Sequence, residues 1–436
     1  MTAADARVPQ ARLVVIGAGL AGVAALLWLT RTYLFYFDEW TFITTAPSWT
    51  WSTWFEPHNE QPSMLLRALY WLLLNTAGLR TYVPYMAVTL AFHFASVLLI
   101  FELVRRRASE LIGVGAALLL LVLGAGWEDV LWAFQMAWLA SVALGLGALL
   151  IAQRPARIVA PAVLIAASLS FSAVGAAFAI ALTVQVLSDK SRRRQVWWLV
   201  GVAVTFAAWY ATFGRQAGQA NRPSATNLLA DPAYALWGLS QSLAGLIGEG
   251  GWIGAVLLVG AVVALAWRWT RHGADGFAIG VAAGLVAFYL LTGLTRAQMG
   301  WEQAGASRYV YVGAVLWLLL LADAAKGLPW RGTWRPALVA VLFLACFNSA
   351  VLMFAFTAAK TVQMEREAAD LQALAAERTD SCLDPAAHPD PLVMPQLTAQ
   401  LYYPAVDHYG DPIAGRPNRD RADFLMAQDN LRRAGC

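Results

Sequence analysis

Charge is scarce in this sequence: Asp, Glu, Lys and Arg make up only 13% of its 436 residues, whereas 59% are hydrophobic. With a mean hydropathy of +0.55, the chain lacks the polar surface that a soluble globular protein needs. The composition therefore excludes a water-soluble fold and predicts an all-α polytopic membrane protein. Its 20 Trp and 13 Tyr fit the aromatic belts at the two bilayer interfaces.

A signal-peptide cleavage site is also lacking. The apolar stretch from Leu13 to Thr30 is long enough to span a bilayer, and no small-residue cleavage motif follows it. We therefore expect a retained first helix. Lysine is rare beside arginine, a bias typical of bacterial genomes with a high GC content.

Apolar runs near the spanning length of about 20 residues predict nine transmembrane helices. They lie at about residues 12–33, 82–104, 110–126, 130–152, 196–213, 251–268, 276–293, 308–325 and 336–357. A further apolar stretch between Arg157 and Lys190 is too long for one span and is broken near Ser168 to Ser172. It predicts a hairpin of two short helices, which brings the expected total to about eleven.

Basic residues gather on one face of these expected spans. Sixteen of the 31 Lys and Arg lie there: Arg7, Arg12, Arg105–Arg107, Arg154, Arg157, Lys190, Arg192–Arg194, Arg268, Arg271, Lys326, Arg331 and Arg335. By the positive-inside rule the N-terminus is cytoplasmic, and an odd number of spans places the tail after Phe356 outside. We expect a multi-pass protein of the bacterial plasma membrane.

Two acidic pairs stand on the expected outer face. Asp38 and Glu39 follow the first span in "FYFDEWTF" and begin a long outer loop, about residues 35 to 80. Glu128 and Asp129 lie in "GWEDVLWAFQ", which we expect to be a short second outer loop. Carboxylates beside apolar spans are costly to hold, so they mark functional candidates.

Other polar candidates follow in the outer loops. His58 and Glu60 lie in "PHNEQP", and Arg296 and Arg308 flank the last outer loop. Apolar residues at helical spacing around Arg67 predict an interfacial helix from Ser63 to Leu79, and a second is expected at Tyr234 to Leu246.

A span, an acidic pair directly after it, a long outer loop with an interfacial helix and a second acidic site together resemble the GT-C superfamily of integral-membrane glycosyltransferases. Protein mannosyltransferases, aminoarabinose transferases and actinobacterial arabinosyltransferases share this plan. The resemblance covers about residues 10 to 215. It implies an inverting transferase that takes a sugar from a polyprenyl-phosphate donor and passes it to a glycan, lipid or protein acceptor outside the membrane, with no nucleic-acid partner. By this similarity Asp38–Glu39 matches the first acidic motif and Glu128–Asp129 the second.

Such a reaction needs a carboxylate as a base and a cation near the leaving group. A carboxylate, Asp38 or Glu39, takes the proton of the attacking hydroxyl. The first acid of the motif aligns best with the family's base, so we predict that Asp38 is the base and that Glu39 orients the acceptor or supports a cation. A fixed cation stabilises the leaving phosphate, a role that fits Arg308 with Arg296 as its partner.

Each candidate also has a plainer interpretation. Asp38 could cap a helix. The pair Glu128–Asp129 could simply be polar residues of a tight loop, or it could hold a divalent cation. His58 with Glu60 could bind a metal or the acceptor. Arg308 could simply anchor its helix at the lipid headgroups. The loop tryptophans could form a sugar platform or part of the interface belt.

Other function classes stay open. A polytopic transporter or flippase would also have many spans, although its ionisable groups should lie near the midplane. A lipid-linked glycan ligase of the cell envelope would depend more on loop arginines and a His, and a structural subunit would not need the acids. The sequence names neither the sugar, the acceptor nor a cofactor.

The chain divides into three expected modules. Residues 1–215 form the catalytic membrane module, 216–357 a variable transmembrane module and 358–436 a small extracytoplasmic tail that caps the outer loops. Cys382 and Cys436 lie in this tail, where disulfides persist, and we predict that they are bonded.

Overall fold

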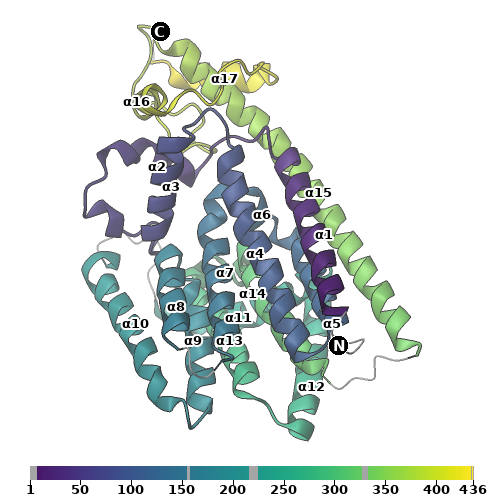
Figure 1. Cartoon of the computed structure of the whole chain (residues 1–436). Coiled ribbons are helices and arrows are strands. Elements are labelled where there is room, and N and C mark those ends of the chain that lie inside the picture. Colours follow the sequence, from purple (N-terminus) through teal and green to yellow (C-terminus); the bar gives the residue numbers. More distant parts are fainter. Residues whose placement is uncertain (1–6, 155–157, 216–223, 327–331, 434, 436) are drawn as a thin grey trace. The chain divides into compact units, whose positions relative to one another are not determined.

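The structure is a computed structural model that describes residues 7–154, 158–215, 224–326, 332–433 and 435 (Figure 1). Over these ranges it contains seventeen α-helices, short 3-10 segments and two isolated β-bridges, without a strand. The predicted all-α class is confirmed.

Eight helices of the described chain are long and apolar enough to cross a membrane. Their α-helical parts are α1 (Arg7–Leu29), α4 (Val83–Arg107), α7 (Met136–Ile151), α10 (Val196–Trp209), α12 (Trp252–His272), α13 (Gly276–Arg296), α14 (Ser307–Ala324) and α15 (Trp334–Glu377). A ninth span results if α5 (Glu110–Leu121) and the segment Gly124–Leu131, bent by 44° from it, are counted together. The chain is thus a multi-pass membrane protein.

The predicted hairpin is present as α8 (Val159–Phe171) and α9 (Gly175–Ser188). These apolar helices have 13 and 14 residues, so each is only about 20 Å long at 1.5 Å per residue. Neither meets the length of a full span. Length and composition therefore support eight or nine crossings, and the expected total of about eleven stays a prediction.

One helix differs from its expectation. Instead of a short interfacial helix, α11 (Ala225–Gly245) has 21 residues and packs against α13 and α14. Gly238 makes this packing possible, because a Cβ there would lie 2.2 Å from the ring of Tyr289. Pro232 lies inside the helix. The helix is thus longer than expected, and its position at the interface stays a prediction.

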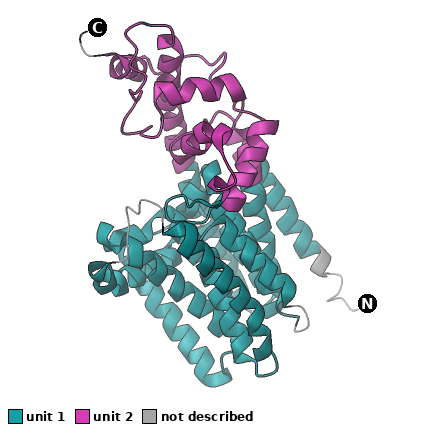
Figure 2. Ribbon diagram, turned by 90° about the vertical axis from the view of Figure 1, so that its left-hand side faces the viewer, with its two compact units in different colours: residues 1–24, 55–63, 89–354 teal, residues 25–54, 64–88, 355–436 magenta. Residues whose placement is uncertain are grey.

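The chain forms two compact units (Figure 2). Unit 1 comprises residues 1–24, 55–63 and 89–354, and unit 2 comprises residues 25–54, 64–88 and 355–436. Unit 2 contains the helices α2 (Asp38–Thr45), α3 (Met64–Thr76), α16 (Ala399–Tyr409) and α17 (Arg421–Leu431). The long first loop is divided between both units, and the three modules expected along the sequence stay a prediction.

Within unit 1, a row of glycines lets α13 approach α9 closely. A Cβ at Gly280 would lie 2.3 Å from the carbonyl oxygen of Ala181, and one at Gly284 would lie 2.5 Å from that of Ala177. Gly276 continues the row at the same spacing of four residues. Small residues at this spacing are the usual means of helix association in lipid, where the hydrophobic effect does not drive helices together.

We expect Gly280→Ala to destabilise unit 1 by about 1–3 kcal/mol, because the added methyl group overpacks the contact with Ala181. Gly260→Ala in α12 is the matched control, since a Cβ there meets no atom within 4 Å. Thermal unfolding in detergent measures both. An unfolding temperature of Gly280→Ala equal to that of Gly260→Ala would contradict the close contact.

The tail packs against the first loop within unit 2, as expected. The ring of Tyr402 in α16 lies edge-on to that of Trp40 in α2, with centroids 5.7 Å apart. The backbone N–H of Leu79 donates to the carbonyl of Tyr409 at 3.0 Å. Cys382 is disulfide-bonded, whereas Cys346 is a free thiol. The predicted disulfide partner of Cys382, Cys436, lies outside the described residues.

Candidate functional site

The "HNEQ" segment of unit 1 forms a tight turn with a strained backbone. Asn59 and Glu60 have φ angles of 47° and 64°, a region that residues other than glycine rarely adopt. Two backbone hydrogen bonds of 3.0 Å close the turn between His58 and Gln61. Such strain persists only where the surroundings fix it, and it is concentrated at functional sites.

Side chains of the turn attach it to two helices of the bundle. The Glu60 carboxylate pairs with the Arg296 guanidinium at 3.3 Å, at the end of α13. The Ser172 hydroxyl, directly after α8, donates to the Gln61 side-chain oxygen at 2.6 Å. Glu60 and Arg296, which were separate candidates in the sequence, are thus joined in one ion pair.

His58 connects the turn to the second acidic site. Its ring meets the Phe134 ring edge-on, with centroids 5.3 Å apart. Phe134 in turn stacks on Trp132, which directly follows α6 (Trp127–Leu131). The turn and α6 therefore belong to one aromatic cluster.

The second acidic pair does not lie in an exposed loop as expected. Glu128 and Asp129 lie in the first turn of α6, and Asp129 is 0% exposed. Two glycines let the chain bend inward before α6. A Cβ at Gly124 would lie 2.2 Å from the carbonyl oxygen of Ser349, and one at Gly126 would lie 2.9 Å from the Tyr311 ring.

Glu128 forms an ion pair with Arg308, the arginine that was predicted from the sequence to stabilise the leaving phosphate. The Arg308 guanidinium, in the first turn of α14, lies 2.6 Å from the Glu128 carboxylate. The backbone N–H of Glu128 also donates to the Ser307 hydroxyl at 3.0 Å. Arg308 is thus oriented by Glu128.

Asp129 is a buried carboxylate whose two oxygens have no hydrogen-bond partner among the described residues. Its electrostatic neighbours include Glu128 and Arg308. A buried charge without such partners is costly, so a ligand or a proton is expected at this position. In the described part of the chain, no group of three or more His, Cys, Asp or Glu side chains could hold a metal ion. A cation at Glu128 and Asp129 would need further ligands from substrate or water.

A buried histidine in the same region was missed by the sequence analysis. His93 in α4 is 0% exposed, and its Nδ1 lies 2.9 Å from the Tyr311 hydroxyl. Its Nε2 lies 3.3 Å from the carbonyl oxygen of Leu121. Because that oxygen can only accept, Nε2 carries the proton and Nδ1 accepts from Tyr311. The signal was present in the sequence, as a lone histidine inside an apolar span.

In unit 2 the first acidic pair divides into two different environments. Glu39 is 0% exposed, and its carboxylate accepts hydrogen bonds from the Tyr70 hydroxyl at 2.7 Å and from the Tyr82 hydroxyl at 3.0 and 3.2 Å. It also accepts from the backbone N–H of Tyr36 at 3.1 Å. Glu39 therefore joins α2 to α3 and to the segment that precedes α4.

Asp38 is half-buried and is the first residue of α2. The Gln396 amide lies 3.5 Å from its Oδ1, at the limit of a hydrogen bond. Phe37 just before it has a φ of 55°, another strained position.

Arg67 is a buried residue of α3, the helix that was predicted to be interfacial. Its guanidinium lies over the rings of Phe42 and Trp49, at 4.8 and 5.2 Å from their centroids, and the residue is only 6% exposed. Such cation–π contacts stabilise a desolvated cation. Trp51 and Trp71 are 80% and 47% exposed, which suits either an interface belt or a sugar platform.

We expect alkaline pH to destabilise unit 2 through Tyr70. Burial, with the charge of Glu39 as a second cause, raises the pKa of Tyr70 well above its ordinary value of 10.0. As the pH rises, Tyr70 therefore loses its proton in the unfolded chain before it does so in the folded protein. Its contribution to the free energy of unfolding is fully present below pH 10.0 and is lost as the pH rises above that value. Thermal unfolding at increasing pH measures this loss. An equal alkaline loss in Tyr70→Phe would contradict the assignment.

The structure thus gathers six of the eight predicted site residues in unit 1: His58, Glu60, Glu128, Asp129, Arg296 and Arg308. Asp38 and Glu39 belong to unit 2. The chain matches no family model, and no curated protein or solved structure matches it significantly.

Proposed function

We propose that the chain is an inverting glycosyltransferase that moves a sugar from a polyprenyl-phosphate donor to a glycan, lipid or protein acceptor. It would act at the outer face of the bacterial plasma membrane, with a cytoplasmic N-terminus and an extracytoplasmic C-terminus. One observation carries the proposal furthest. Of two adjacent acids, Glu39 is immobilised by hydrogen bonds, whereas Asp38 stands half-buried at a helix N-terminus.

In this proposal Asp38 is the general base. Its carboxylate takes the proton of the acceptor hydroxyl while that oxygen attacks the anomeric carbon from the face opposite the phosphate. The bond between the anomeric carbon and the phosphate oxygen breaks as the new glycosidic bond forms, so the configuration inverts. Glu39 keeps Asp38 in place by fixing the start of α2.

The leaving lipid phosphate gains negative charge, which Arg308 and Arg296 would stabilise. Their ion pairs with Glu128 and Glu60 are compatible with this role, because a guanidinium has five N–H donors and can bind a second anion. The unpartnered oxygens of Asp129 fit a divalent cation. When bound, such a cation would neutralise charge on the donor phosphate.

One feature favours a second candidate, a transporter or flippase. Bent helices with buried ionisable groups form the substrate and ion sites of many transporters. The 44° bend between α5 and Gly124–Leu131, with Asp129 at 0% exposure, has both properties. Transport predicts movement of an intact substrate, whereas transfer predicts its cleavage.

Proteoliposomes distinguish the two candidates. They would be loaded with polyprenyl-phosphate sugars that carry a radiolabelled hexose or pentose, together with a crude envelope fraction that supplies acceptor hydroxyls. Both lipid-phosphate release and sidedness of the intact donor would be measured. We expect release that requires the protein. Intact donor that changes sides without release would favour the flippase and contradict the transferase.

A further inference from the structure

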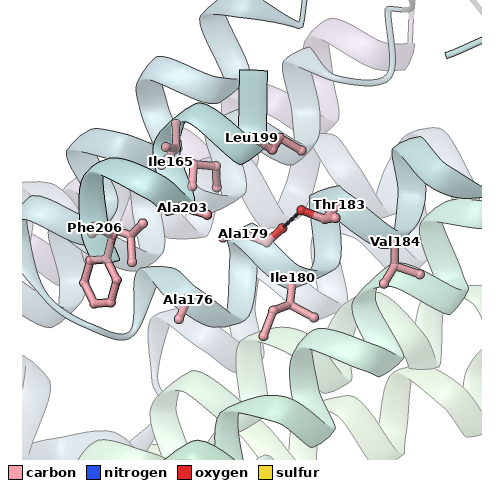
Figure 3. Close-up of a pocket in the computed structure, with 11 residues that line it drawn as sticks. Ile165, Ala176, Ala179, Ile180, Thr183, Val184, Leu199, Ala203 and Phe206 are labelled. Carbon is pink, nitrogen blue, oxygen red and sulfur yellow. Dashed lines mark hydrogen bonds between the residues drawn. The ribbon is translucent and has the colours of Figure 1, made fainter. Parts of the chain in front are cut away.

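A groove of about 270 Å³ lies between α8, α9 and α10 of unit 1 (Figure 3). Its lining is apolar apart from Thr183 and includes Ile165, Leu199 and Phe206. The Thr183 hydroxyl donates to the carbonyl of Ala179 at 2.7 Å, shown dashed in Figure 3. The groove therefore offers no free side-chain donor, and its walls suit a hydrocarbon.

The groove is accessible from the lipid side of α10. Only 11% of the span Arg193–Gly214 is buried in the protein, so most of its surface faces the bilayer. Ala203, which lines the groove, is itself exposed. A hydrocarbon chain could therefore enter sideways from the membrane.

The helices α8 and α10, which form two walls of the groove, both contact the segment that carries the His58–Gln61 turn. Ser172, directly after α8, donates to Gln61, and Trp209 at the end of α10 donates its ring N–H to the Phe55 carbonyl at 2.8 Å. Phe213, in the π-helical turn Tyr210–Gly214, stacks on the Phe55 ring. A π-helical turn of this kind is frequent at functional sites. The two helices that wall the groove are thus attached at this end to the segment that carries His58 and Glu60.

A cation follows α10 along the chain, beyond the groove residue Phe206. Arg215 directly follows the π-helical turn and is exposed. It forms no ion pair with any residue of the described chain. Arg215 lies nine positions after Phe206, which corresponds to about 13 Å at the α-helical rise per residue. An apolar groove with a cation beyond its end matches a lipid that has an anionic head.

We infer that this groove docks the isoprenoid chain of a polyprenyl phosphate and that Arg215 receives the phosphate. The identity of the lipid rests on the proposed glycosyl transfer. The new element is the place where the carrier lipid lies before its phosphate reaches Arg296 and Arg308. Ordinary bilayer phospholipid is the competing occupant. Its acyl chains would satisfy the walls equally, so the experiment must separate the two lipids.

The probe is a polyprenyl phosphate with a diazirine on its chain, photolysed with the full-length protein in nanodiscs. We expect mass spectrometry to find the label on α8, α9 and α10. Ala203→Trp, which fills the groove, should lower this labelling about tenfold, equivalent to ~1.4 kcal/mol of lost binding. Ala208→Trp is the control, because Ala208 is an exposed position of the same helix outside the lining. Arg215→Gln should weaken labelling, whereas Arg194→Gln should not.

Competition then identifies the occupant. Unlabelled polyprenyl phosphate should reduce the labelling, and an equal amount of phosphatidylglycerol should not. Equal competition by both lipids, or equal labelling of Ala203→Trp and Ala208→Trp, would overturn the inference. Labelling needs no sugar and no acceptor. Specific labelling without any sugar transfer would therefore refute the proposed function alone, and transfer without specific labelling would refute the groove alone.

Discussion

Replacing Asp38 with Asn should lower sugar transfer by about a hundredfold or more, because the variant keeps the size of the side chain but loses the proton acceptor. The half-buried position at the start of α2 should tolerate this change, so folding and membrane insertion should be preserved. The assay is transfer from a labelled polyprenyl-phosphate sugar in membranes that contain equal amounts of wild type and variant.

Glu39→Gln is the matched control for this prediction. Glu39 accepts hydrogen bonds from Tyr70, Tyr82 and the backbone of Tyr36, so its loss should act mainly on the stability of unit 2. Full activity in Asp38→Asn with none in stable Glu39→Gln would reverse the two roles. Full activity in both variants would show that neither acid is the base.

Arg308→Ala should lower transfer strongly, by about a hundredfold, since the leaving phosphate would lose a fixed positive charge. The change also leaves Glu128 without its ion-pair partner and removes a cation that interacts electrostatically with Asp129. Arg308→Lys retains a charge but not the planar, multiply donating guanidinium, so we expect partial activity. Initial rates at saturating donor measure both variants.

The pairing with Glu128 allows a sharper control. Glu128→Gln removes the charge of the partner and leaves Arg308 free to meet the phosphate, so this variant should retain more activity than Arg308→Ala. Adding Glu128→Gln to Arg308→Ala should improve stability without restoring transfer. Near-normal transfer by Arg308→Ala would assign the arginine to anchoring or packing.

Hydropathy predicted the helices well, because a span needs a long apolar run whatever it packs against. Even the hairpin of α8 and α9 followed from a break near Ser172. What hydropathy could not predict was packing. The environment of α11 depends on the fit of Gly238 to the Tyr289 ring, a contact between residues about fifty positions apart.

The site shows the same limit. Candidate acids and arginines were recognisable as charges beside spans, but their pairing was not, since Glu60 meets Arg296 and Glu128 meets Arg308 across long sequence separations. The burial of Asp129 depends on two glycines that let the chain turn inward. His93 was recognisable as a lone histidine inside an apolar span, but its pairing with Tyr311 in a distant helix was not.

The central claim is that this chain cleaves the bond between a sugar and a polyprenyl phosphate. The most direct measurement mixes purified protein in nanodiscs with labelled hexose and pentose donors and a crude envelope acceptor fraction, then quantifies released lipid phosphate and the anomeric configuration of the product. The proposal predicts release with inverted configuration in the wild type and almost none in Asp38→Asn. Donor that stays intact with the wild type, while the folded protein binds it, would contradict glycosyl transfer.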